Sequence, residues 1–161
     1  MADRTAAVVT VSDSVNAGTA KDASGALAAA ALEDLGFTVS ESVVVADGVE
    51  SVASVLTRLA DQVSLIVTTG GTGPSPRDLT PEGTRSVIDR EIPGISEAMR
   101  AATFGKVPFG MLSRGVAGLR GGCLIVNMPG SPKAVAEGFD VIGSVLIHAV
   151  DIASGDFGRH D

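Results

Sequence analysis

The sequence has little of what several common protein classes require. Its 161 residues include one cysteine, two histidines and no tryptophan or tyrosine. A single cysteine excludes an intrachain disulfide, and the histidines offer neither zinc-ligand spacing nor a Ser-His-Asp arrangement. Cys123 precedes the apolar residues Leu124, Ile125 and Val126, so we expect a buried strand thiol and not a nucleophile.

Positive charge is also scarce. Lys and Arg number 12 against 19 Asp and Glu, which gives a net charge of -7. No broad basic face is available to neutralise a nucleic-acid backbone, so nucleic acid is not an expected partner. An anionic ligand would need backbone N–H groups, locally placed cations or a metal ion.

Long apolar runs are missing as well. No run approaches the roughly 18 uninterrupted apolar residues of a spanning helix, and residues 1–4 lack the basic start and apolar block of a signal peptide. We therefore expect no membrane association and a cytoplasmic protein. Hydrophobic residues make up 45% of the chain, enough to offset chain entropy. The length predicts a single domain over residues 1–161, with 154–161 as a loose tail.

Short apolar runs alternate with stretches of helical spacing. Strands are expected at residues 6–11, 39–45, 64–69, 111–116 and 123–127. Helices are expected at residues 23–35, around 52–59, at 81–89 and 95–104, and from 132 onward. Uniformly apolar strands that alternate with helices indicate an α/β fold, a three-layer α/β/α arrangement with a mostly parallel sheet of about five strands. Ligands bind such sheets beyond the carboxyl ends of the strands.

The most informative segment is the loop at residues 70–80. It carries Gly70, Gly71 and Gly73 directly after an apolar run, and glycines let the backbone approach a ligand and aim N–H groups at phosphate oxygens. The spacing matches neither the Walker loop nor G-x-G-x-x-G, and a tight turn into a helix is the alternative. We expect that helix to start with Thr80 as N-cap and Pro81 as first residue.

Two acidic positions near these loops each have two explanations. Asp78 lies beside the glycines, where a hard cation such as Mg²⁺ would need a carboxylate, or it forms an ion pair with its neighbour Arg77. Asp47 lies three residues before Glu50, the spacing of a capping box, so a helix cap explains it without any chemistry. The residues alone leave both choices open.

Residues 128–133, between a strand and the last helix, are a second candidate for phosphate binding. Ser131 is the expected N-cap and Pro132 the first helical residue. A helix N-terminus attracts anions, whereas Lys133 in the first turn opposes the helix dipole. An anionic ligand therefore explains Lys133 better than helix stability does. Weaker candidates on apolar runs are Ser12, Asp13, Ser14, Ser113 and Arg114.

Taken together and in this order, these segments resemble the Mog and MoaB family of molybdenum cofactor biosynthesis proteins, the molybdopterin adenylyltransferases. The resemblance spans nearly the whole chain. It rests on Val11-Ser12-Asp13-Ser14, Lys21-Asp22-Ala23-Ser24-Gly25, residues 69–82, Ile92-Pro93-Gly94, Leu112-Ser113-Arg114 and Asn127-Met128-Pro129-Gly130-Ser131-Pro132. Ala46 departs from the family, many members of which have proline there, so this loop is expected to be less rigid.

The resemblance implies a molybdopterin-binding domain that transfers AMP from ATP, the co-substrate, to molybdopterin with Mg²⁺. It implies catalytic and metal-binding roles for Asp47 and Asp78. The implied substrate- and phosphate-binding residues are Ser12, Asp13, Ser14, Thr69, Gly70, Gly71, Thr72, Gly73, Ser113, Arg114, Pro129, Gly130, Ser131 and Lys133.

The resemblance also implies partners. The family forms trimers or hexamers, and the last helix stays apolar at Val141 and Val145 beyond its main face, so a homotrimer or hexamer is expected. The enzyme that inserts molybdate is an expected partner.

Two hypotheses of other classes compete with the enzyme. One is a non-catalytic MoaB-type protein that binds molybdopterin in the same pocket. The other is a flavodoxin-like or dinucleotide-binding domain, which the absence of Trp, Tyr and a first-loop fingerprint disfavours. The presence of both Asp47 and Asp78 favours the adenylyltransferase.

Overall fold

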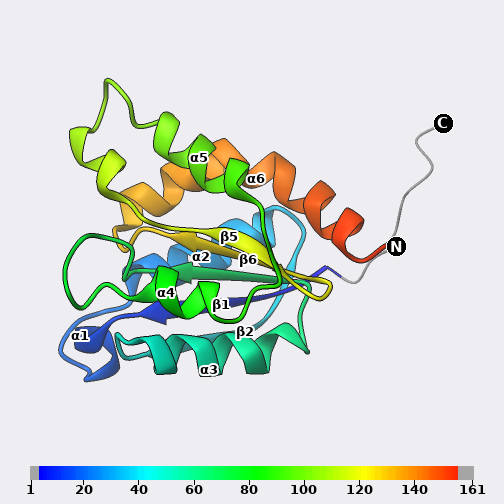
Figure 1. The fold of residues 1–161 in the computed structure, drawn as a ribbon, viewed down its shortest axis with the longest axis horizontal. Helices are drawn as coiled ribbons and strands as arrows, with labels where there is room; N and C mark the ends of the chain where they lie inside the picture. The colour runs from blue at the N-terminus through cyan, green and yellow to red at the C-terminus, as the bar shows by residue number, and fades with distance from the viewer. Residues whose placement is uncertain (1–3, 156–161) are drawn as a thin grey trace.

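A computed structural model describes residues 4–155, and within this range six strands form one sheet in the order β2-β1-β3-β6-β5-β4 (Figure 1). The first four strands in that order are parallel, whereas β5 runs antiparallel to both of its neighbours. The strands are β1 (Thr5–Val11), β2 (Thr38–Val45), β3 (Leu65–Thr69), β4 (Arg90–Glu91), β5 (Ala117–Arg120) and β6 (Cys123–Met128). The helices are α1 (Asp13–Asn16), α2 (Ala23–Asp34), α3 (Val49–Ala60), α4 (Thr80–Arg85), α5 (Pro93–Ala101), the 3₁₀ helix η1 (Pro108–Leu112) and α6 (Pro132–Ala153).

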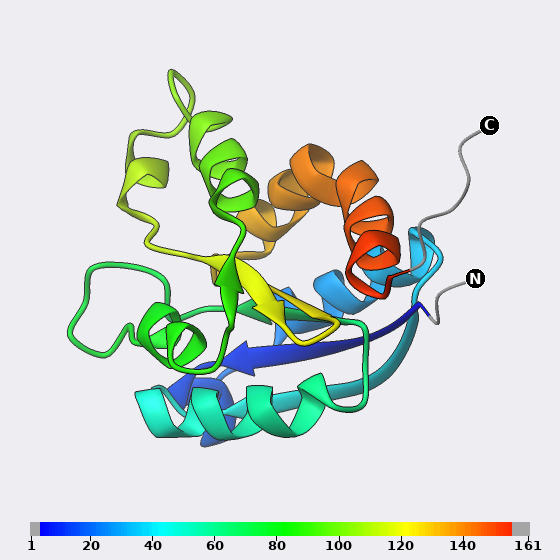
Figure 2. The same cartoon turned by 45° about the vertical axis from the view of Figure 1, so that its right-hand side comes forward.

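The fold has three layers, as expected, with helices on both faces of the sheet. Figures 1 and 2 show α5 and α6 over one face and α3 over the other. Successive residues of a strand point to opposite faces, so Val8 packs in the core beneath α2 and α6 while Val9 packs against α3. Residues of β3 and β6 are buried along the whole strand, as the uniformly apolar runs predicted.

The predicted strand at residues 111–116 is wrong. Pro108 instead opens η1, and the chain then runs to β5, a strand that lies in the glycine-rich segment between the two predicted strands at 111–116 and 123–127. Gly121 has φ +54° and, with Gly122, forms a two-residue turn that pairs Arg120 with Cys123. This hairpin explains why a glycine-rich segment is a strand here.

The predicted boundaries of two helices are also corrected. Leu79, not Thr80, is the N-cap of α4, and the Thr80 hydroxyl donates to the Gly70 carbonyl at 2.9 Å. The helix ends at Arg85 instead of continuing to 89, because the chain turns to enter β4, a two-residue edge strand that its length hid from the sequence. The helix predicted at 95–104 begins at Pro93 and ends at Ala101.

The last helix agrees with the prediction. Ser131 caps α6 by accepting a hydrogen bond from the Ala134 N–H at 3.2 Å. Of the tail predicted at 154–161, residues 156–161 lie outside the described residues. A search of residues 4–155 finds no helix with both the length and the apolar character needed to cross a bilayer.

Candidate functional site

The loops singled out in the sequence meet at the carboxyl ends of β1, β2, β3 and β6. Backbone hydrogen bonds join them: Ser12 N donates to Val45 O at 3.0 Å, and Gly70 N donates to Met128 O at 3.1 Å. Because parallel strands end at one edge of a sheet, residues far apart in the sequence come together there. The sheet thus brings together the segments at residues 12–14, 46–48, 70–80 and 129–131.

Glycine is required at the start of the loop at residues 70–80, which we call the glycine loop. Gly70 has φ +91° and Gly71 has φ +69°, a region that other residues rarely adopt. A side chain at Gly70 would collide with the Val11 carbonyl, and one at Gly71 with the Thr80 hydroxyl. The loop therefore lies directly against β1 and α4.

The segment after η1 holds the far part of the glycine loop. Arg114 N donates to Thr72 O at 2.7 Å, and its guanidinium donates from Nε to Gly73 O at 2.9 Å and from Nη2 to Asp78 O at 2.6 Å. The same guanidinium forms an ion pair with Glu82 of α4. Arg114 was expected on a strand and at a phosphate; it lies on a loop, and its side chain is engaged with protein groups.

The capping hypothesis for Asp47 is wrong. The N-cap of α3 is Gly48, and no side chain caps that helix. Asp47 instead pairs with Asp13 in a reciprocal arrangement: Asp47 N donates to Asp13 Oδ1 at 2.9 Å, and Asp13 N donates to Asp47 Oδ2 at 3.1 Å. The carboxylate of Asp47 thus belongs to the loop cluster at the sheet edge.

Arg77 pairs with Asp13 and not with its neighbour Asp78, so the local ion-pair explanation of Asp78 is also wrong. Hydrogen bonding to Arg77 and to the Asp47 backbone holds the pKa of Asp13 below its ordinary value of 3.8. The pKa of Arg77 is raised, mainly by its hydrogen bond to Asp13, with smaller contributions from the negative charges of Asp47 and Asp78. One guanidinium therefore lies in the field of three carboxylates, which we call the acidic cluster: Asp13, Asp47 and Asp78.

Asp78 is half-buried on the inner side of the glycine loop. Its carboxylate accepts a hydrogen bond from Ser75 N at 3.1 Å, and a side chain at Gly73 would come within 2.9 Å of its Oδ2 atom. Gly73 itself has no positive φ. Its lack of a side chain leaves room for the Asp78 carboxylate.

The chemistry of the acidic cluster suits a hard divalent cation. Carboxylate oxygens are the ligands that Mg²⁺ takes from proteins, commonly one or two of them, with substrate phosphates and water completing the octahedron. Within residues 4–155, no group of three or more His, Cys, Asp or Glu side chains is arranged to hold a metal ion. A cation at Asp47 and Asp78 would therefore need phosphate oxygens and water as its further ligands.

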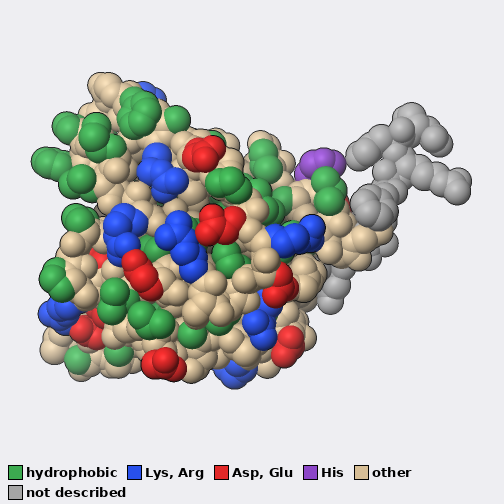
Figure 3. All heavy atoms as spheres, viewed as in Figure 1, with side chains coloured by type: hydrophobic (Ala, Val, Ile, Leu, Met, Phe, Trp, Pro, Cys, Tyr) green, Lys and Arg blue, Asp and Glu red, His purple; other side chains and the backbone are tan. Residues whose placement is uncertain are grey.

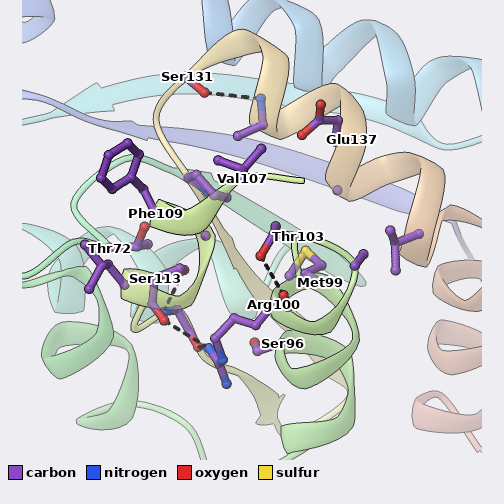
Figure 4. A pocket seen from close by; sticks show the side chains of 18 of the residues that line it. Thr72, Ser96, Met99, Arg100, Thr103, Val107, Phe109, Ser113, Ser131 and Glu137 are labelled. Carbon is purple, nitrogen blue, oxygen red and sulfur yellow. Dashed lines mark hydrogen bonds between the residues drawn. The ribbon is translucent and has the colours of Figure 1, made fainter. Parts of the chain in front are cut away.

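A cavity of about 560 Å³ lies on the other side of the glycine loop (Figure 4). Its walls come from the glycine loop, α5, η1, the segment after η1, the end of β6 and α6. The predicted residues that line it are Thr72, Gly73, Ser113, Pro129 and Ser131. The predicted residues that do not are Ser12, Asp13, Ser14, Asp47, Thr69, Gly70, Gly71, Asp78, Arg114, Gly130 and Lys133.

Sequence reasoning missed the α5 wall of this cavity. Ser96, Met99, Arg100 and Thr103 recur at helical spacing and all line the cavity, and this spacing was the available signal. The Nη1 atom of Arg100 donates to Gly115 O at 2.9 Å, which joins α5 to the segment after η1.

The mouth of the cavity carries apolar side chains. Phe109 of η1, also a lining residue, is 76% exposed. Figure 3 shows hydrophobic side chains gathered at the upper left of the molecule.

A buried asparagine supports the floor of the cavity. Asn127 of β6 donates from Nδ2 to Thr68 and Thr84 hydroxyls, each at 3.0 Å, and accepts from Val116 N at 3.2 Å. It is 1% exposed, and all its polar atoms are satisfied within the protein. The side chain thus ties β3, α4 and the segment after η1 to one another behind the cavity.

The chain is similar to known proteins over most of its length. The profile of the family described as "Probable molybdopterin binding domain" matches residues 7–149. A molybdopterin adenylyltransferase of Helicobacter pylori strain J99 is 40% identical over 116 residues, covering 71% of this chain and 66% of that protein. The Escherichia coli K12 protein of the same name is 45% identical over 101 residues, covering 59% of this chain and 52% of that protein. The matched segment thus spans about half to two thirds of the length of these relatives.

Solved structures are similar over nearly the whole chain. The molybdopterin biosynthesis enzyme MoaB of Thermus thermophilus superposes with a TM-score of 0.89 at 41% identity, covering 94% of this chain and 96% of that one. The Mog protein of Mycobacterium ulcerans gives 0.88 at 46% identity, covering 93% and 99%. The matched region contains the acidic cluster, the glycine loop and the cavity.

Proposed function

This chain belongs to the family of molybdopterin-binding domains of molybdenum cofactor biosynthesis, and on that premise we propose that it transfers AMP from ATP to molybdopterin. The products are adenylylated molybdopterin and pyrophosphate. One observation carries the proposal: Gly73 lines the cavity and also lies against Asp78, so an organic ligand in the cavity could extend a phosphate toward the acidic cluster.

The cavity suits the organic part of molybdopterin. Its 560 Å³ lie within the range of small-molecule sites, and its lining combines Met99 and Phe109 with a few polar groups such as Arg100. The phosphate of the same ligand would then meet the loop at Thr72 and Gly73. Two anionic substrates would thus converge on the glycine loop.

The transfer needs no protein nucleophile. An oxygen of the terminal phosphate of molybdopterin attacks the α-phosphorus of ATP, the bond from that phosphorus to the bridging oxygen breaks, and pyrophosphate leaves with the bond electrons. The protein's task is to position two polyanions and to stabilise the charge that develops. Asp47 and Asp78 would hold Mg²⁺, which supplies charge neutralisation at the phosphates.

Assembly and location are part of the same proposal. The outer flank of α6 carries Val145 and Ile152, which are 48% and 47% exposed, next to the half-buried Val141. An apolar flank of this kind favours self-association, and the resemblance to the family implies a homotrimer or hexamer. We further propose a cytoplasmic enzyme that passes its product to the enzyme of molybdate insertion.

Incubation with ATP, Mg²⁺ and molybdopterin, assayed for pyrophosphate, tests the function. We expect pyrophosphate only when all three are present, in an amount equal to adenylylated molybdopterin. Release that does not need molybdopterin would indicate hydrolysis of ATP and contradict the proposal. Binding of molybdopterin without pyrophosphate would identify a non-catalytic MoaB-type binding protein instead.

A further inference from the structure

Arg114 donates hydrogen bonds to both ends of the segment at residues 73–78 of the glycine loop. Its Nε donates to the carbonyl of Gly73 and its Nη2 to the carbonyl of Asp78, at 2.9 and 2.6 Å. Its backbone N–H holds Thr72 O at 2.7 Å. Arg114 thus holds both ends of the turn that runs from Gly73 to Asp78. The position of the Asp78 carboxylate therefore depends on these hydrogen bonds.

The guanidinium itself is anchored by Glu82. The Arg114 nitrogens Nη1 and Nη2 face the two carboxylate oxygens of Glu82 in a bidentate pair. Hydrogen bonding to Arg114 keeps the pKa of Glu82 below its ordinary value of 4.5 and raises the pKa of Arg114. Four of the five guanidinium N–H groups donate to protein groups, which leaves a single N–H on Nη1, so a phosphate could form a bidentate pair with this guanidinium only by displacing some of these bonds.

Arg114 also joins the acidic cluster to the cavity. Its neighbours Ser113 and Gly115 line the cavity, whereas Arg114 does not. A change in the wall at residues 113–115 therefore reaches Asp78 through the guanidinium and the carbonyls it holds.

We infer that Arg114 is a positioning residue that acts through Asp78, and not a phosphate ligand. The inference rests on the proposed function. Productive geometry at the transferring phosphorus depends on placement within about an ångström, and such misplacement costs roughly 10²-fold in rate. Losing the side chain of Arg114 should therefore lower kcat while binding of molybdopterin is kept.

The test compares Arg114→Lys and Arg114→Gln with a matched control, Arg85→Gln. Arg85 forms an ion pair with Glu91 at 3.1 Å that is more exposed and has no hydrogen bond to the glycine loop. We expect kcat to fall roughly 10- to 100-fold in Arg114→Gln and less in Arg114→Lys. Molybdopterin affinity should stay within about threefold, and Arg85→Gln should retain its kcat.

A double-mutant cycle with Asp78→Asn separates a positioning role from an independent one. If Arg114 acts through Asp78, the double variant should turn over no more slowly than Asp78→Asn alone. Multiplied effects on kcat would overturn the inference. A loss of molybdopterin affinity of more than about tenfold with kcat retained would also overturn it and restore the phosphate-binding role.

A readout without turnover keeps the inference testable if the proposed function fails. The Ser75 N–H donates to Asp78 Oδ2, so the hydrogen-exchange rate of this amide reports whether the Asp78 carboxylate keeps its position. Exchange at Ser75 should accelerate in Arg114→Gln and stay at the wild-type rate in Arg85→Gln. Unchanged exchange in Arg114→Gln would overturn the positioning role whatever the activity. Should Arg114→Gln fail to fold, Glu82→Gln, which removes the anchor alone, takes its place with the same expectations at smaller size.

Discussion

The two sides of the glycine loop are built differently. On one side the acidic cluster lies just beyond the carboxyl ends of the strands, where Asp13 and Asp47 are joined by hydrogen bonds from the backbone of each to the carboxylate of the other. On the other side the cavity is walled by α5 and η1, which lie in the long connection between β4 and β5. The sheet therefore fixes the charged groups, whereas the helical segment between β4 and β5 shapes the cavity for an organic ligand.

This difference separates two tasks. Groups that must meet a reacting phosphorus need fixed positions, which short loops on a parallel sheet provide. Groups that enclose a ligand need shape and apolar surface, and the lining residues Phe109 and Leu112 of η1, 76% and 49% exposed, supply that surface. If the division is real, variants on the two sides should affect different kinetic constants.

The largest effect is expected on the acidic side. Asp78→Asn keeps the size of the side chain and removes a charge that would hold the proposed Mg²⁺, so kcat should fall by roughly 10²-fold or more. Molybdopterin affinity should largely survive. Pyrophosphate release and titration calorimetry on the same preparation measure both constants.

A matched comparison for Asp78→Asn is Asp61→Asn, which removes one charge from the C-cap of α3, outside the glycine loop and the cavity lining. Its kcat should equal that of the wild type. Near-normal turnover of Asp78→Asn would mean that the acidic cluster only shapes the loop.

On the cavity side, Ala134→Phe should raise KM for molybdopterin by about tenfold or more, because the ring fills space beside Ser131. Turnover at saturation should change far less than in Asp78→Asn. Ala136→Phe, on the same helix but outside the cavity lining, is the control and should leave KM near its wild-type value. A fall of kcat at unchanged KM in Ala134→Phe would break the division between the sides.

Prediction from sequence also differed between the two sides. The strand ends were predictable because uniformly apolar runs mark parallel strands, and the chemistry of such sheets lies beyond their carboxyl ends. Gly70 and Gly71 were predictable for the same local reason, since a left-handed backbone leaves a direct signal in composition. The strand ends and these two glycines thus follow from short-range rules.

The cavity side depends on tertiary contacts that no local pattern encodes. The segment at residues 111–116 is apolar enough to predict a strand, yet Arg114 is drawn away by Thr72, Asp78 and Glu82. Asp47 shows the same limit at the acidic side. Its capping-box spacing is a correct local pattern, and the distant backbone of Asp13 takes the carboxylate instead.

Acid should weaken the ion pair that anchors Arg114. The pKa of Glu82 is lower in the folded protein than its ordinary value of 4.5, so the stability from this pair is present above that value and is lost as pH falls through the folded pKa. The melting temperature of wild type should exceed that of Glu82→Gln by a few degrees at pH 7, and the difference should close as the pH falls below 4.5 toward the folded pKa of Glu82. Thermal melts across pH 3–7 measure this, and a constant difference would exclude the titration of Glu82 as its source.

The smallest effect is expected at the start of α6. The side chain of Lys133 is 81% exposed, and its Nζ lies 3.9 Å from Glu137 Oε1. Its contribution to phosphate affinity therefore comes from a charge that solvent and salt screen. Lys133→Ala should weaken molybdopterin binding by about two- to threefold at low ionic strength, and Lys133→Arg should not. Because the screening length is about 10 Å at 0.1 M salt and about 3 Å at 1 M, the effect should disappear as salt is raised. Calorimetry at both ionic strengths decides the point, since a loss that persists at 1 M would place the ammonium in direct contact with the phosphate and move Lys133 from the rim into the site.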